Sequence, residues 1–313
     1  MIEPPYGAIW HRLKAGKAVP FLGAGASFVG RTPDAKWDPS DPTFLPSGAE
    51  LASFLAEETR FPSSSAFDLE DLAKVASYYT DVNGRPVLRD RLREILDHDY
   101  VSGALHEFLA ELPNPMVIVV TNYDTLLEQA FRAAGKPYDL VIHATDRKDF
   151  ANAVLWCKHG ASEPKFREPN KLDQDIDLAS TTVIYKMHGT IHRETNRWDN
   201  FVITEEDYVD FLSRMTSHTA IPSLFLPYFR DRSFLFLGYS LRDWNLRVIL
   251  KNLRRDLRSR FAADDDDYEL IPSWAIQRNP SELEKKLWDK RNVSIFDLSI
   301  DGFVSEMQKC RLR

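Results

Sequence analysis

One short run of apolar residues limits the folds that are open to this chain. Residues 116–120 read Met-Val-Ile-Val-Val and follow a boundary marked by Pro113 and Pro115. Five residues are too few for a helix, and the run is rich in β-branched side chains. Such a run is typical of a strand that is buried on both faces, as in a parallel sheet. We therefore expect a parallel sheet at the centre of the fold.

Further short apolar runs alternate with helical patterns along the chain. They predict strands at residues 19–22, 138–142, 153–158, 182–187, 233–237, 270–277 and 292–298. Apolar residues at helical spacing predict helices at residues 6–16, 125–134, 205–215, 221–230, 241–254 and 301–309. Another helix is predicted to open with Asn279 as its cap and Pro280 at its first position. The polar residues 161–180 predict a loop.

This alternation predicts an α/β fold with a doubly wound, mostly parallel Rossmann-like sheet. Residues 51–111 carry helical patterns but no strand candidate, which indicates a helical insertion beside the sheet. Ser47 and Glu50 have the spacing of a capping box at the start of that segment. We predict one domain over residues 1–313, with 51–111 inserted in it.

Composition excludes several classes of protein. The chain has 313 residues, of which 43% are hydrophobic and 28% charged, which suits a folded globular protein. Its net charge of -7 disfavours a general nucleic-acid coat, because phosphate neutralisation needs clustered cations. Two cysteines, Cys157 and Cys310, cannot form a four-cysteine zinc module. No apolar run approaches the roughly 20 residues of a membrane helix, so we expect a cytoplasmic protein.

Small and polar residues follow four of the predicted strands, where ligands of open α/β sheets bind. The first group is Gly-Ala-Gly-Ala-Ser at residues 23–27, which would let the backbone approach a pyrophosphate closely. The third glycine position of a dinucleotide fingerprint holds Phe28 instead. A tight turn between strand and helix, with no ligand, is the structural alternative.

The second group is Thr121, Asn122 and Asp124, directly after the strand at 116–120. A carboxamide donates and accepts hydrogen bonds at once, so Asn122 can hold a ribose hydroxyl or a water. A structural alternative is that Asp124 caps the next helix, which leaves Thr121 and Asn122 unexplained.

Two further groups follow the strands at 182–187 and 233–237. His188 can act as a general base near neutral pH, although a single strand-end histidine is more often structural. Gly238 and Ser240 open the predicted helix at 241–254, whose N-terminus would favour a phosphate or ribose oxygen. Helix capping by Ser240 is the structural alternative there.

The order of these four groups resembles the sirtuin (silent-information-regulator type) superfamily. A Gly-Ala-Gly-x-Ser turn, a Thr-Asn-x-Asp strand end, a Lys-x-His-Gly strand end and a Gly-x-Ser-Leu strand end occur in that order. The spellings Thr-Asn-Tyr-Asp and Gly-Tyr-Ser-x-x-Asp are similar to those of the bacterial sirtuin-like branch of antiphage defence. The resemblance extends from about residue 15 to about residue 300.

The resemblance implies an NAD site. Asn122 and His188 would flank the nicotinamide ribose as catalytic residues, and Asp124 would face the nicotinamide amide. The other implied cofactor-binding residues are Gly23, Ala24, Gly25 and Ser27 at the pyrophosphate, Gly238 and Ser240 near the adenosine ribose, and Thr121. Thr121 stands where the lysine deacylases of the superfamily carry Gln, and the zinc-binding cysteines of those enzymes are missing.

These departures favour an NAD glycohydrolase that releases nicotinamide and ADP-ribose and uses no metal. Cleavage would pass through a ribosyl cation, as in other glycosyl hydrolyses. The resembled branch implies activation by homo-oligomerisation or by a protein partner, such as a HerA/FtsK-type ATPase or an Argonaute-like protein. An NAD-dependent protein deacylase and a non-catalytic module that senses NAD or ADP-ribose are the alternatives.

Overall fold

The computed structural model describes residues 3–28, 31–32, 34–144, 153–216, 221–239 and 271–312. Within these ranges the largest sheet has nine strands in the order β11-β10-β9-β1-β2-β6-β3-β4-β5. The strands are β1 Ala18–Leu22, β2 Val117–Val120, β3 Asp139–His143, β4 Val154–Cys157, β5 Lys165–Arg167, β6 Val183–Lys186, β9 Ser233–Leu237, β10 Ser273–Gln277 and β11 Val293–Asp297.

The sheet is mostly parallel, as predicted. Neighbouring strands from β11 to β3 pair in parallel, whereas β4 pairs antiparallel with both β3 and β5. Each predicted strand is present, with its ends shifted by a few residues at most, so the α/β fold class is confirmed. The loop predicted over 161–180 is partly wrong, since β5 and the 3₁₀ helix η3 (Pro169–Gln174) lie within it. The predicted helix at 241–254 lies outside the described residues.

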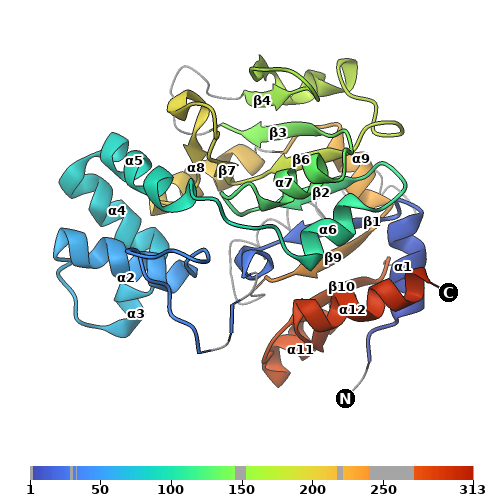
Figure 1. Cartoon of the computed structure of the whole chain (residues 1–313), viewed down its shortest axis with the longest axis horizontal. Helices are drawn as coiled ribbons and strands as arrows, with labels where there is room; N and C mark the ends of the chain where they lie inside the picture. The colour runs from blue at the N-terminus through green and yellow to red at the C-terminus, as the bar shows by residue number, and fades with distance from the viewer. Residues whose placement is uncertain are drawn as a thin grey trace.

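Helices cover both faces of the sheet (Figure 1). One face packs against α1 Tyr6–Lys14, α6 Ala104–Ala110, α7 Leu126–Ala133 and α12 Ile300–Arg311, and the other against α8 Glu205–Thr216, α9 Phe225–Arg230 and α11 Glu282–Asp289. Within β1, Val19 and Phe21 join one core while Ala18 and Leu22 join the other. Burial on both faces explains why the central strands are continuously apolar. None of the described helices has the length and apolar character of a membrane span.

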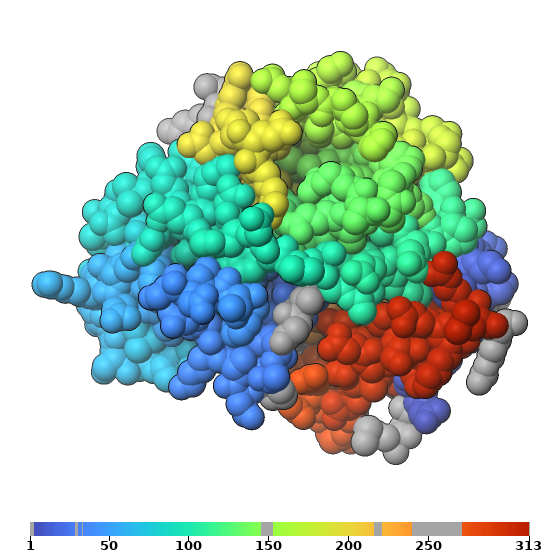
Figure 2. Space-filling view, viewed as in Figure 1, coloured from blue at the N-terminus to red at the C-terminus, as the bar shows by residue number. Residues whose placement is uncertain are grey.

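A third apolar core lies in a helical lobe formed by α2 Gly48–Thr59, α3 Ala66–Leu69, α4 Leu72–Asn83 and α5 Arg85–Leu96. These helices lie at one side of the molecule, in blue and cyan (Figures 1 and 2). Phe201, in a small pairing of β7 Gly189–Thr190 with β8 Asn200–Phe201, joins the same core. Helix α6 packs instead on α7 and α12. The single domain with an insertion at 51–111 stays a prediction.

Capping boxes that begin with a serine fix the starts of two of the described helices. The capping box of Ser47 and Glu50 at α2 is confirmed. The predicted cap at Asn279 is wrong, because Ser281 caps α11 and Glu284 completes the box. Asn279 has φ +51°, in the left-handed region, whereas an N-cap residue adopts an extended conformation.

Removal of the α11 cap tests its contribution to stability. Ser281→Ala deletes the acceptor for Glu284 N–H, so we expect the free energy of unfolding to fall by about 1 kcal/mol. Ser65→Ala is the matched control, because Ser65 occupies the cap position of α3 without a side-chain cap hydrogen bond. Urea unfolding of both variants measures the difference. Equal losses in the two variants would contradict the assignment.

Candidate active site

The residues that follow four neighbouring strands lie at one edge of the sheet. Strands β9, β1, β2 and β6 are adjacent and parallel, so their carboxyl ends share that edge. Val120 of β2 pairs in register with Lys186 of β6. Asn122 and His188 therefore each lie two residues beyond the same pair, on strands spaced about 4.8 Å apart.

The turn after β1 packs directly on the turn after β9. Gly23 N–H donates to Leu237 O at 3.0 Å, and Gly25 N–H donates to Gly238 O at 2.9 Å. Gly238 has φ +67°, and a Cβ atom there would lie 2.2 Å from Ala26 N. Glycine is therefore required at this contact for both conformation and space. This gives the tight-turn interpretation direct support, while pyrophosphate binding by Gly23, Ala24, Gly25 and Ser27 stays a prediction.

The Asn122 carboxamide is fixed on this turn. Its Nδ2 donates to Gly23 O at 2.9 Å and to Ser27 Oγ at 2.7 Å. The half-buried side chain thus uses both amide protons within the protein. No described residue donates to Asn122 Oδ1, so this oxygen is the group that can accept a hydrogen bond from a ligand or a water.

Asp124 and Thr121 hold the surrounding backbone. Asp124 Oδ2 accepts a hydrogen bond from Ser27 Oγ at 2.7 Å, and Asp124 Oδ1 accepts one from Leu126 N–H at 3.0 Å. Thr125, not Asp124, occupies the N-cap position of α7, and it makes no side-chain cap hydrogen bond. The Asp124 carboxylate stabilises the start of α7 from the preceding position, through its hydrogen bond with Leu126 N–H. Thr121 N–H and Oγ1 both donate to Leu22 O, each at 3.1 Å, which joins the end of β2 to β1.

His188 lies in an aromatic environment under α8. Its ring meets Tyr208 and Phe211 edge-on, with centroids 5.6 and 5.5 Å away. Only 4% of the residue is exposed, and its Nε2 has no hydrogen-bond partner among the described residues. Burial lowers the pKa of His188 to about 4. The imidazole is therefore neutral near pH 7 and able to accept a proton.

Sequence reasoning missed a group of buried charges beneath Asp124. Lys186 is fully buried, and its Nζ lies 2.5 Å from Asp124 O and 3.4 Å from Glu128 Oε1. His106 is also buried, and its pKa is lowered to about 4, chiefly by desolvation. The sequence did contain one signal for this cluster. Lys186 ends a strand that was expected to be buried on both faces, and a buried lysine needs a partner. The partners could not be read from the sequence.

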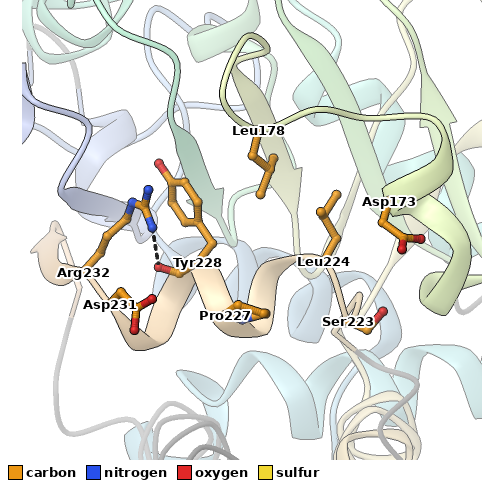
Figure 3. Close-up of a pocket in the computed structure, with 8 residues that line it drawn as sticks. All are labelled: Asp173, Leu178, Ser223, Leu224, Pro227, Tyr228, Asp231 and Arg232. Atoms are coloured by element: carbon orange, nitrogen blue, oxygen red, sulfur yellow. Dashed lines mark hydrogen bonds between the residues drawn. The ribbon is translucent and has the colours of Figure 1, made fainter.

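A cavity of about 420 Å³ lies elsewhere (Figure 3). It lies beside α9, and none of the predicted site residues lines it. Arg232, one of its lining residues, donates through Nε to Gly16 O, close to the start of β1. The cavity is therefore at the amino-terminal edge of the sheet, opposite Asn122. Ser240, predicted near the adenosine ribose, lies outside the described residues. Within the described ranges, no group of three or more His, Cys, Asp or Glu side chains is arranged to hold a metal ion.

Substitution of Gly135 and Gly238 distinguishes the cost of backbone strain from the cost of steric contact between the two turns. Gly135 and Gly238 have similar φ angles of +62° and +67°, but only Gly238 lies against neighbouring backbone. We expect Gly135→Ala to cost about 1 kcal/mol of stability. Gly238→Ala should cost about 3 kcal/mol or more, since backbone atoms must move. Urea unfolding measures both, and equal costs would contradict the close packing of the two turns.

The sequence of the chain is similar to those of known proteins. Residues 116–296 match the family described as SIR2-like domain. The chain is 22% identical over 285 residues to defense-associated sirtuin 2 of Bacillus subtilis, an alignment that covers 90% of this chain and 23% of that protein. It is 30% identical over 185 residues to NAD(+) hydrolase ThsA of Acinetobacter baumannii (strain 532279), covering 59% of this chain and 31% of that protein.

A third relative, NAD(+) hydrolase ThsA of Enterococcus faecium, is 29% identical over 190 residues, with 60% of this chain and 33% of that protein covered. The chain thus spans about a quarter to a third of the length of these relatives. The family match covers more than half of the chain and includes the strand ends of Asn122 and His188. The resemblance predicted from the four motifs is confirmed, and the chain belongs to the SIR2-like domain family.

Proposed function

We propose that this domain is an NAD+ nucleosidase that hydrolyses the nicotinamide–ribose bond and acts as an effector of antiphage defence. One observation carries the proposal: the Asn122 carboxamide is fixed by two hydrogen bonds at the edge of the sheet where the next strand presents His188. The names of the relatives support it, since ThsA is an NAD(+) hydrolase and the Bacillus subtilis protein is a defense-associated sirtuin.

In this proposal NAD is the substrate and lies across the carboxyl edge of the sheet. The cofactor-binding residues are those implied by the resemblance: Gly23, Ala24, Gly25 and Ser27 with Thr121, Gly238 and Ser240. The hydrogen bonds of Asp124 favour an indirect role in NAD binding. One of its carboxylate oxygens accepts from Ser27 Oγ and the other from Leu126 N–H. Contact between Asp124 and the nicotinamide amide stays a prediction.

The proposed reaction needs one base and one oriented water. The nicotinamide ring nitrogen of NAD is positively charged, so nicotinamide leaves neutral and takes the electron pair of the C1′–N bond. The water oxygen bonds to C1′ of the resulting ribosyl cation, which gives ADP-ribose. Asn122 Oδ1 accepts a hydrogen bond from this water or from a ribose hydroxyl, and His188 Nε2 accepts the proton that the water loses.

Unregulated cleavage would exhaust the cellular NAD pool. We therefore propose that homo-oligomerisation or a protein partner, such as a HerA/FtsK-type ATPase or an Argonaute-like protein, activates the domain in the cytoplasm. The name of the Bacillus subtilis relative, defense-associated sirtuin 2, supports the defence role in this proposal.

Substitution of the two proposed catalytic residues tests the assignment. In assays of nicotinamide release from NAD, we expect Asn122→Ala and His188→Ala to lower the rate by about 100-fold or more, since oriented acid–base groups contribute 10²–10⁴. Asn83→Ala and His98→Ala are matched controls at exposed positions and should stay within about twofold.

Other outcomes separate the alternative functions. No release by the unaltered protein, alone or with a candidate partner, contradicts the proposal. Release only with an acyl-lysine peptide indicates a deacylase. Saturable NAD binding without turnover indicates a sensing module.

The low pKa of His188 predicts the pH dependence of cleavage. A general base must be neutral, so kcat/KM should be constant from about pH 6 to pH 8 and should fall as the pH approaches 4. Initial rates in short assays, with stability followed in parallel, measure the profile. An inflection near 6.5, the ordinary histidine value, would contradict a buried base at position 188.

A further inference from the structure

Four ionisable side chains form a buried cluster directly beneath the candidate site. Asp124, Glu128, Lys186 and His106 are 7%, 3%, 0% and 2% exposed. Desolvation has the largest effect on His106 and lowers its pKa, Asp124 raises that pKa, and Lys186 lowers it further. The proposed reaction assigns no proton transfer to any of these four groups, and it gives Glu128, Lys186 and His106 no contact with NAD.

Burial of the Lys186 ammonium is costly. An ion loses its hydration on burial, and an apolar residue of similar volume is often more stable in such a position. The ammonium has two close oxygen partners, the Asp124 carbonyl at 2.5 Å and Glu128 Oε1 at 3.4 Å. The Glu128 carboxylate accepts no hydrogen bond from any described residue, so its contribution is charge neutralisation.

The Lys186 contact connects to Asn122 through a continuous set of hydrogen bonds. Lys186 Nζ donates a hydrogen bond to the backbone carbonyl of Asp124. The side-chain carboxylate of Asp124 accepts a hydrogen bond from Ser27 Oγ. Ser27 Oγ in turn accepts from Asn122 Nδ2. The Lys186 ammonium therefore fixes the backbone of Asp124. The Asp124 carboxylate orients the Ser27 hydroxyl, which in turn orients the Asn122 carboxamide.

We infer that Lys186 is a positioning residue for Asn122, with Glu128 as its buried counter-charge. The inference rests on the proposed function, in which the Asn122 carboxamide accepts a hydrogen bond from the attacking water or from a ribose hydroxyl. Lys186 belongs to β6, the strand that leads to His188, and Asp124 follows β2, the strand that leads to Asn122. The contact thereby fixes the two strand ends relative to each other.

Three variants separate positioning from stability. Lys186→Met keeps the length of the side chain but leaves the Glu128 carboxylate buried without its counter-charge, so this variant should be destabilised. Lys186→Met combined with Glu128→Gln removes both charges and should recover a melting temperature close to that of the unaltered protein. Lys165→Met, at an exposed position of β5, controls for the substitution itself.

The measurements are kcat and KM for nicotinamide release and the side-chain amide resonances of Asn122. These resonances are identified as the pair that disappears in Asn122→Ala. In the stable double variant we expect kcat to fall by about 10-fold or more with KM within about threefold. The Asn122 amide pair should shift or broaden, because its fixed donors to Gly23 and Ser27 are released. Lys165→Met should leave all three quantities unchanged.

Wild-type kcat in a double variant with recovered stability would overturn the inference, since the cluster would then serve stability alone. An unchanged Asn122 amide pair in that variant would overturn it as well. The resonance measurement does not depend on turnover. If the unaltered protein releases no nicotinamide, the proposed function fails, while the resonances still decide whether Lys186 positions Asn122.

Discussion

Two hydrogen bonds from the Asn122 carboxamide hold the candidate site together. They join the end of β2 to the turn that follows β1, at Gly23 O and Ser27 Oγ. The turn after β1 lies directly against the turn after β9. This contact requires Gly25 and Gly238, because a Cβ atom at either position would collide with the backbone of the other turn. The glycines are therefore explained by packing, and the geometry of the candidate site depends on this packing.

Burial controls the electrostatics beneath this edge. Desolvation lowers the pKa of both His106 and His188 to about 4, below the ordinary value near 6.5. As the pH falls from 6.5 toward 4, the unfolded chain binds protons that the folded chain does not, so stability falls over this window. The same burial keeps His188 neutral at pH 7. A proton acceptor in an apolar environment thus carries a cost in acid stability.

Strand positions could be predicted well because burial on both faces leaves an unmistakable apolar run, as at 116–120. The edge strand β5 was missed for the opposite reason: none of the residues in Lys165–Arg167 is fully buried, and two of the three are charged. Strand ends also predicted the edge to which Asn122 and His188 belong. The partners of Lys186 could not be predicted, since Asp124 and Glu128 are distant in sequence and meet it only through the pairing of β2 with β6. Likewise, the contact of Gly238 with Gly25 exists only once β9 lies beside β1.

If the proposed function is right, Asn122 and His188 act on one anomeric carbon of NAD. The decisive measurement is a structure with a non-hydrolysable carbocyclic analogue of NAD. We expect the carbon equivalent to C1′ to lie between the two side chains. Asn122 Oδ1 and His188 Nε2 should each be within hydrogen-bond distance, about 3 Å, of a single water beside that carbon. An analogue bound with its nicotinamide ribose away from either side chain would rule out this arrangement. A His188 ring that stays enclosed by Tyr208 and Phe211, without access to the ligand, would rule it out as well.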